Sequence, residues 1–332
     1  MDQGTEKSPF YRLVALWAFS EAFLGGMLHG FHLPVTGLVL GSFAVVCLSA
    51  IASQTSGKGR FLKATVLVIL VKAILSPHSP PTAYLAVFLQ GLFAELIFGL
   101  PLPYRVQTIL LGILSLVESA FQRLIVLTVL FGNDFWTAVD GFTESVVKSI
   151  GFGSFSGSLY LVSAYVFIHF GTGVFAGYYS SKLPDWLKNQ TFAPLPEVNL
   201  QNQAYFKTSS SRTKRPFSSP LSFLLFGLLV LGLMEAYSTQ SWLITGTNKP
   251  LRLLIRSALV LSVWYFYLAP ILLKWFRNWV EKKKKKRWQE IEKVLNLLPE
   301  MHEIMLTSWQ QAKLSPLANR IPAFVKTSFY LC

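Results

Sequence analysis

The sequence predicts an all-α, polytopic membrane protein: a six-helix bundle followed by a two-helix hairpin, with about eight transmembrane helices in all. Two observations of composition point to this. Hydrophobic residues make up 52% of the 332 residues, and charged residues only 14%, where a soluble domain usually has about 25%. The charges also gather in short connectors between long apolar stretches, which is the pattern of a chain whose solvent is lipid.

A helix needs about 20 apolar residues to cross a bilayer, with a range near 17 to 25. By this criterion the expected spans are Leu13–Leu28, Val35–Ser53, Phe61–Ser76, Thr82–Leu100, Val106–Phe131, Ser158–Tyr179, Leu221–Tyr237 and Leu251–Phe276. Glu21 interrupts the first stretch and no clean cleavage site follows, so we expect a retained helix rather than a signal peptide.

Composition divides the chain into four expected regions. They are a six-helix membrane domain (1–182), a polar cytoplasmic linker (183–220), a transmembrane hairpin (221–276) and a basic amphipathic cytoplasmic tail (277–332). We find no convincing internal repeat, which disfavours transporters built from inverted repeats.

The distribution of Lys and Arg predicts the orientation, because basic connectors stay in the cytoplasm. One set of connectors carries Lys7, Arg12, Lys58, Arg60, Lys63, Arg105, Lys182, Lys188, Lys207, Arg212, Lys214, Arg215 and the run Lys282–Arg287. These all fall on one side only if the number of spans is even. We therefore expect both ends in the cytoplasm and a multi-pass protein of the cell (inner) membrane.

Two segments outside the spans have helical periodicity. In 139–152, Val139, Phe142, Val146 and Ile150 share one face, and Glu144 and Lys148 form an i,i+4 pair, which predicts a short helix on the outer surface. In the tail, Ile291, Val294, Leu295 and Leu298 share one face, and we expect Pro299 to break that helix. The tail is expected to be an anchor on the membrane surface or, alternatively, to dock to a partner protein.

Tryptophans at 275, 279 and 288 flank the run Lys282–Arg287, as aromatic residues do at a membrane interface. This pattern predicts contact with anionic lipid headgroups. The net charge of +14 is carried by connectors of this kind and no reader motif is present, so we expect no binding to nucleic acid.

Several polar side chains fall inside expected spans, where they are costly and usually face the bundle interior or a wet cavity. The candidate substrate-binding residues are Glu21, Lys72, Gln90, Glu118, Gln122 and Arg123. The alternative is a structural network, in which Lys72 or Arg123 pairs with Glu21 or Glu118, or Lys72 reaches outward to the interface. Glu95 and His169 are expected to be structural.

Three outer-connector histidines, His29, His32 and His78, are candidate metal ligands, although ordinary solvated histidines explain them as well. We expect no enzyme and no resident cofactor. In Gly153–Gly157 (GSFSG), Phe155 occupies the place of the nucleophile, and neither a zinc-protease nor a phosphate-loop motif is present.

Small residues recur every four positions at Ala18, Ala22 and Gly26 on the first expected helix, which could face another subunit. The same spacing at Gly37 and Gly41, and at Gly173 and Gly177, is expected to serve packing within the chain.

The six-helix region resembles the substrate-binding S component of energy-coupling factor (ECF) transporters over roughly residues 10–180. The resemblance is carried by Ala18–Ala22 (AFSEA), Gly25–Gly41 (GGMLHGFHLPVTGLVLG), Ser76–Tyr84 (SPHSPPTAY) and Gln90–Glu95 (QGLFAE). It implies that Ala18 and Ala22 dock to a transmembrane coupling subunit, and that paired ATPase subunits drive the uptake. The hairpin 221–276 and the tail are additional to that family. Its cobalt and nickel members begin Met-His, whereas this chain begins Met1-Asp2.

The sequence thus predicts a transport subunit that binds a small water-soluble micronutrient, vitamin-like or a metal ion, from the outside. The rival hypothesis is a membrane scaffold that acts through its hairpin and basic tail. An intramembrane enzyme is the third hypothesis, for which no nucleophile–base pair is visible.

Overall fold

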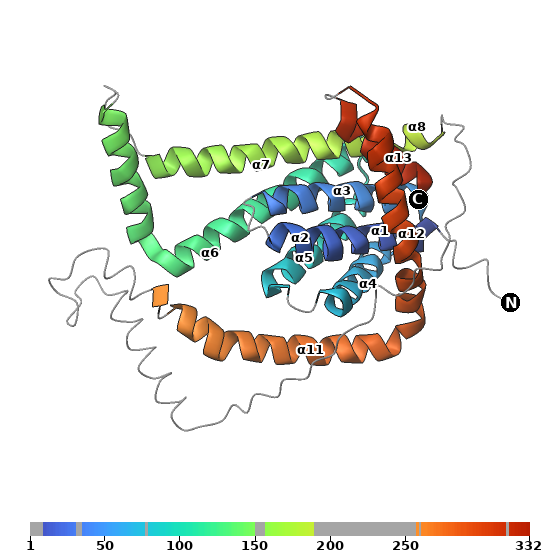
Figure 1. The fold of residues 1–332 in the computed structure, drawn as a ribbon, viewed down its shortest axis with the longest axis horizontal. Coiled ribbons are helices and arrows are strands. Elements are labelled where there is room, and N and C mark those ends of the chain that lie inside the picture. Colours follow the sequence, from blue (N-terminus) through green and yellow to red (C-terminus); the bar gives the residue numbers. More distant parts are fainter. Residues whose placement is uncertain are drawn as a thin grey trace. The chain divides into compact units, whose positions relative to one another are not determined.

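The computed structural model describes residues 9–30, 35–76, 79–149, 157–188, 257–258, 260–316 and 319–332. Every regular element in these ranges is helical and none is a strand, which confirms the all-α class (Figure 1). Of the expected linker 183–220, residues 183–188 form a short helix and the rest lies outside the described residues, as do the expected span Leu221–Tyr237 and the first part of Leu251–Phe276.

The helices of the first 190 residues follow the expected spans closely. They are α1 (Pro9–Phe19), η1 (Ser20–Leu24), α2 (Gly25–Gly30), α3 (Thr36–Gln54), α4 (Arg60–Leu75), α5 (Pro81–Ile97), α6 (Tyr104–Ser149), α7 (Gly157–Ser181) and α8 (Leu183–Lys188). The first expected span is a helix whose middle, η1, is a π-helical turn. Among the described residues, three helical stretches are long and apolar enough to cross a membrane: Thr36–Gln54, Tyr104–Asn133 and Gly157–Trp186.

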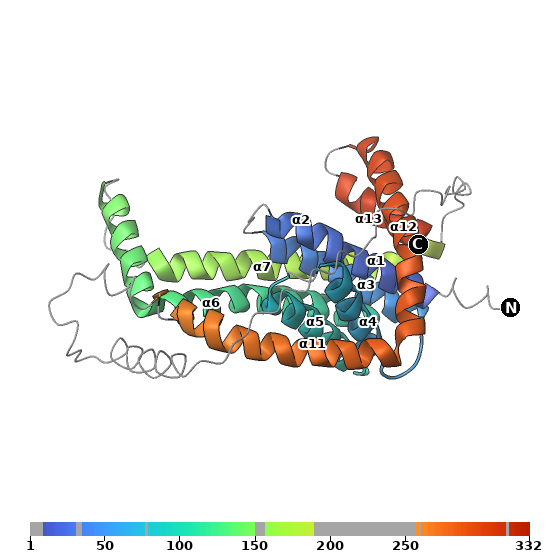
Figure 2. The same cartoon turned by 60° about the horizontal axis from the view of Figure 1, so that its bottom comes forward.

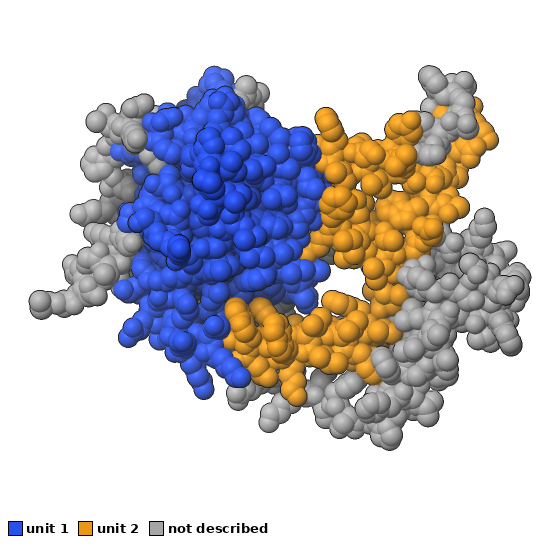
Figure 3. Space-filling model, turned by 180° about the vertical axis from the view of Figure 1, so that it is seen from behind, with its two compact units in different colours: residues 1–120, 168–209, 280–332 blue, residues 121–167, 210–279 orange. Residues whose placement is uncertain are grey.

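The chain divides into two compact units (Figure 3). Unit 1 contains Met1–Ala120, Ile168–Ser209 and Val280–Cys332, and unit 2 contains Phe121–Phe167 and Ser210–Trp279. Residues Val280–Cys332 of the C-terminal tail belong to the same unit as the first helices. The physical reason is the apolar face of the tail, which is buried within unit 1.

The core of unit 1 is built on α1. Every residue of α1 from Leu13 to Phe19 is buried, and α1 packs against α3, α4 and α12. In addition, α4 packs against α5 (Figures 1 and 2). A helix that is buried on all sides has no polar face to offer water, which explains its nearly uniform hydrophobicity.

The C-terminal part contains η3 (Trp264–Leu268), α11 (Ala269–Lys286), α12 (Trp288–Lys313) and α13 (Arg320–Leu331). As the periodicity predicts, Ile291, Val294 and Leu298 are buried, and α12 packs on α1, α4 and α13 (Figures 1 and 2). The apolar face of the tail therefore docks onto helices of its own chain.

The expectation that Pro299 breaks this helix is wrong, because α12 continues through it to Lys313. A proline removes one backbone hydrogen bond and crowds the preceding turn. Here Leu298 before it and Met301 after it are both buried, so packing on either side holds the helix together.

Helix α6 runs from Tyr104 to Ser149 but contains a break at Gly132, whose φ of 70° lies in the left-handed region that favours glycine. The residues after the break include the predicted helix of the 139–152 segment as far as Ser149. Its Glu144–Lys148 pair is present, with 2.8 Å between the carboxylate and the ammonium, and Phe142 and Val146 are exposed.

Candidate functional site

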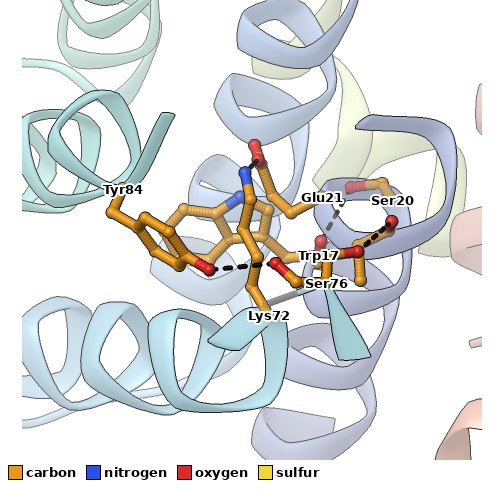
Figure 4. Close-up of polar contacts among 7 residues, drawn as sticks. Trp17, Ser20, Glu21, Lys72, Ser76 and Tyr84 are labelled. Atoms are coloured by element: carbon orange, nitrogen blue, oxygen red, sulfur yellow. Dashed lines mark hydrogen bonds and ion pairs between the residues drawn. The ribbon is translucent and has the colours of Figure 1, made fainter. Parts of the chain in front are cut away.

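A buried ion pair lies at the π-helical turn of the first helix. The ammonium of Lys72, on α4, lies 2.7 Å from Oε2 of Glu21, on η1, and the two side chains are only 1% and 3% exposed (Figure 4). Trp17, Ser20, Ser76 and Tyr84 lie around this pair, and the sequence did not single them out (Figure 4). Pairing between Lys72 and Glu21 is one of the structural alternatives that the sequence leaves open, and Lys72 does not reach outward.

Hydrogen bonds tie the backbone around the pair together (Figure 4). The hydroxyl of Tyr84, on α5, donates to the Ser76 carbonyl at 3.1 Å, and the Ser76 hydroxyl donates to the Ala22 carbonyl at 3.0 Å. The Ser20 hydroxyl donates to the Trp17 carbonyl at 2.8 Å. The ring of Tyr84 also lies 5.7 Å from the Lys72 ammonium, within the range of a cation–π contact.

We define the Glu21–Lys72 cluster as this pair together with Trp17, Ser20, Ser76 and Tyr84. Within it, the two opposite charges neutralise each other. Ser76 and Tyr84 belong to the connector whose sequence carries part of the resemblance to S components, but neither the spacing nor the composition of that connector predicts their contact with the pair. Four separate segments supply the cluster, and only the packing of α1, α4 and α5 brings them together.

A second polar group, the Gln90–Glu118 layer, lies between α3, α5 and α6 and consists of Gln90, Ser115, Glu118 and Ser119. Gln90 is 3% exposed. Three of its buried atoms have no hydrogen-bond partner: Oε1 of Gln90, Oγ of Ser115 and Oε2 of Glu118. The unsatisfied atoms of this layer are oxygens, whereas the Glu21–Lys72 cluster has one unsatisfied donor, the indole N–H of Trp17.

The glycine face of α3 borders this layer. A Cβ added at Gly41 would lie 3.1 Å from Leu116 and 3.8 Å from the Gln90 amide nitrogen. A Cβ added at Gly37 would clash with the hydroxyl of Ser119. The two glycines therefore let α6 approach α3 closely, and Leu116, Ser119 and Gln90 lie against their helix face, which confirms their expected role in internal packing.

Two other candidate residues belong to the other unit. Gln122 and Arg123 lie on α6 in unit 2, and each takes part in an interaction within the described structure. The six candidate residues are thus distributed between two units, and the one direct contact described here is that of Glu21 with Lys72.

Glu95 has the structural role that the sequence predicts for it. Its carboxylate accepts hydrogen bonds from the backbone N–H groups of Gly59 at 2.6 Å and Phe61 at 3.1 Å, at the start of α4. The first N–H groups of a helix lack internal partners, and a carboxylate there also favours the helix dipole. His169 is 1% exposed on α7.

The side chains of the three candidate metal ligands, His29, His32 and His78, are not described in the structure. His32 and His78 lie outside the described residues, and the side chain of His29 does too. Among the side chains that are described, no group of three or more His, Cys, Asp or Glu residues could hold a metal ion. The metal site stays a prediction.

Two residues of the small-residue stripe are buried within the chain, and the third, Gly26, is exposed. Ala18, on α1, is 0% exposed and Ala22, on η1, is 7% exposed, and α1 packs on α3, α4 and α12. Docking of these two residues to another subunit stays a prediction, and it requires a rearrangement of the helices that cover them here.

Helices α6 and α7 meet at glycines, as the sequence predicts for Gly173 and Gly177. A Cβ at Gly173 would lie 2.6 Å from the Gly112 carbonyl oxygen, and one at Gly177 would clash with the Thr108 backbone. The sequence did not single out Gly112, because its partner glycines lie some sixty positions further along the chain.

The basic end of α11 keeps its lysines accessible, with Lys282, Lys285 and Lys286 exposed. Lys284 lies 5.0 Å from the ring of Trp288, and Trp288 itself is exposed. The arrangement is compatible with the headgroup contact expected from the sequence. Arg287 pairs with Glu290 of α12 at 3.0 Å.

Comparisons with protein-family models, with curated proteins and with solved structures found no match to this chain.

Proposed function

We propose that this protein is a multi-pass transport subunit of the cell (inner) membrane that binds a small water-soluble micronutrient from the outside. The observation that carries the proposal is the set of polar side chains enclosed by apolar helices, with the acceptors of Gln90 and Glu118 left without partners. Ionisable residues inside a membrane bundle usually face its interior or a water-filled cavity, and they often mark a substrate pathway. A group of the solute could supply the donors that these acceptors lack.

Contacts near the helix ends support the proposed topology of about eight spans with both ends in the cytoplasm. Lys63, at the start of α4, pairs with Glu290 of α12 at 2.8 Å. Arg105, at the start of α6, lies 4.9 Å from the ring of Tyr178, near the end of α7. Contacts of this kind are expected if these connectors and the tail share one side of the membrane, and the basic residues predict that this side is the cytoplasm.

In the Glu21–Lys72 cluster, a solute could replace either partner of the ion pair. A solute carboxylate would replace Glu21 at the Lys72 ammonium, and a solute N–H donor would replace Lys72 at the Glu21 carboxylate. Opening a buried pair leaves uncompensated charge unless the entering group is also charged and hydrogen-bonded. The exchange therefore favours charged or zwitterionic solutes over neutral apolar ones.

In this proposal, the energy source is inferred from the resemblance to S components. A transmembrane coupling subunit and paired ATPase subunits would drive the uptake, and this chain would supply neither a catalytic residue nor a cofactor. The exposed lysines and tryptophans at the end of α11 would hold anionic lipid headgroups, with no role for nucleic acid.

The test is a thermal-shift screen of the full chain, purified in detergent, against water-soluble vitamins and divalent transition-metal ions. The full chain is needed because removal of α12 would expose the apolar faces of α1 and α4 that it covers. A bound solute raises the melting temperature in a concentration-dependent way. The same screen is run on Glu21→Gln, and on Lys148→Met as a control in an exposed ion pair.

We expect at least one solute to stabilise the native chain and the Lys148→Met variant. The same solute should bind Glu21→Gln with an affinity at least about tenfold lower, which corresponds to about 1.4 kcal/mol of binding free energy. Absence of stabilisation by every compound in the screen would contradict the proposal.

The scaffold hypothesis is favoured by two observations. Glu21 and Lys72 neutralise each other in a buried pair, and α12 and α13 form a packed C-terminal layer on the first helices. If no solute binds, and if the exposed basic end of α11 is needed for retention of the chain on anionic membranes, the scaffold becomes the better explanation.

A further inference from the structure

We propose that the Gln90–Glu118 layer is the subsite for a protonated amine, or an equally strong N–H donor, of the transported solute. This inference rests on the proposed transport function and names the chemical group that the solute must carry. It follows from the chemistry of the atoms that the fold leaves without partners.

The layer offers acceptors. Oε1 of Gln90 and Oε2 of Glu118 are oxygen acceptors, and both are buried without a hydrogen-bond partner. Gln90 is only 3% exposed, so its side-chain amide cannot form hydrogen bonds with water at the protein surface. A buried acceptor without a donor costs about 1–3 kcal/mol, and a carboxylate costs more. A molecule that brings N–H donors removes this cost.

The packing of α3 places these acceptors along one helix face. The Gln90 amide approaches Gly41 of α3, and Ser119, adjacent to Glu118 in the chain, approaches Gly37 one turn away. Ser115, whose hydroxyl is also unpartnered, lies one turn before Glu118 on α6. The three acceptors thus come from α5 and from one turn of α6, and both segments border the glycine face of α3.

Two other carboxylates of the helices show why this site differs. Glu21 has Lys72 as its counter-ion, and Glu95 accepts three backbone N–H groups at the start of α4, from Gly59, Phe61 and Leu62. The unpartnered oxygen of Glu118 has neither kind of partner. A positive group of the solute would supply the missing counter-charge.

Two ammonium ions of equal charge test the inference. Methylammonium carries three N–H donors, whereas tetramethylammonium carries none, so chloride salts at equal concentration separate donation from charge and ionic strength. We expect methylammonium to raise the melting temperature of the full chain in detergent by at least about 2 °C more than tetramethylammonium does. Equal effects of the two salts would overturn the inference and leave buried water as the partner of these acceptors.

Three variants locate the effect. Glu118→Gln and Gln90→Leu should each abolish the difference between the two salts. Gln107→Leu is the matched control, because Gln107 is also a buried glutamine but donates to the carbonyl oxygens of Leu100 at 2.8 Å and Ile97 at 3.4 Å. The difference should persist in that variant. A difference that survives Glu118→Gln and Gln90→Leu together places the amine elsewhere and overturns the assignment.

The outcome also separates this inference from the proposed function. If a micronutrient stabilises the chain in the solute screen but the two ammonium salts act alike, the amine subsite is wrong and transport stands. If no micronutrient binds while methylammonium acts through Gln90 and Glu118, the amine site stands and the proposed micronutrient transport is contradicted.

Discussion

Lys72 and Glu21 form an ion pair of 2.7 Å between α4 and the π-helical turn of the first helix, with both side chains almost fully buried. A buried pair gains little over a pair of apolar residues of similar volume, because desolvation offsets the attraction between the charges. Loss of one partner is different, since the remaining charge is left in an apolar interior. The pair therefore ties the two helices together and resists changes of either residue alone.

The first prediction follows from this asymmetry. Lys72→Met should destabilise the fold by about 3–5 kcal/mol, whereas Glu21→Met combined with Lys72→Met should recover most of the loss. Lys148→Met, in the exposed pair with Glu144, should change stability by no more than about 1 kcal/mol. Thermal unfolding of the purified full chain measures all three. A double variant that is no more stable than Lys72→Met would show that the pair does not account for the effect.

The two buried glutamines predict opposite responses to the same substitution. Gln90→Leu removes an acceptor that has no partner, so the chain without solute should keep or gain stability. Gln107→Leu removes a donor from the Leu100 carbonyl and should cost about 1–3 kcal/mol. The comparison is made by melting temperature in the absence of added solute. Equal losses in the two variants would mean that the Gln90 oxygen has a partner.

The contact between α6 and α7 predicts a strong position dependence along one helix. Gly173→Ala places a Cβ 2.6 Å from the Gly112 carbonyl oxygen, a backbone atom that cannot move aside, so we expect a loss of about 1–3 kcal/mol. Gly171→Ala is the control on the same helix, since a Cβ there meets nothing within 4 Å. That variant should be neutral or slightly stabilising because alanine favours a helix over glycine.

The contact of α12 with α4 predicts an acid-sensitive tail. Partial burial of Glu290 opposes its ionisation, but hydrogen bonds and charges from Lys63, and from Arg287, lower its pKa below the ordinary value of 4.5. A lowered pKa stabilises the docked tail above the unfolded value, and the stabilisation is lost as pH falls through the folded value. Protease sensitivity of the α11–α12 junction should therefore rise below about pH 4.5, and Lys63→Met should make it independent of pH in that range.

The reactivity of Cys332 gives a further measure of tail docking. Burial raises the pKa of its thiol to about 12, the charge of Glu300 adds to this, and Arg12 opposes it. Because the thiolate is the reactive form, a maleimide should label Cys332 slowly at neutral pH and faster once the tail undocks. Cys47 is the second thiol and is fully buried, so Cys47→Ser gives the background in which the labelling of Cys332 is followed. Rapid labelling of the native chain would contradict the docked arrangement.

The positions of the helices follow from local sequence. Val35–Ser53, Phe61–Ser76 and Ser158–Tyr179 are predicted within about two residues of α3, α4 and α7, because an apolar run bounded by polar or proline-containing connectors has few other solutions in a membrane. The exposed Glu144–Lys148 pair and the buried face of α12 also follow from spacing along one helix.

The sequence by itself therefore determined the helical class, the ends of α3, α4 and α7, and which side chains would be costly inside the bundle. Only the tertiary structure decided which partner each of them received. Glu21 and Lys72 are 51 positions apart, Glu95 reaches back 36 positions to Gly59, and the tail joins α1 across nearly the whole chain. The physical reason is that helix periodicity acts over a few residues, whereas the pairing of buried charges depends on which helix faces come into contact.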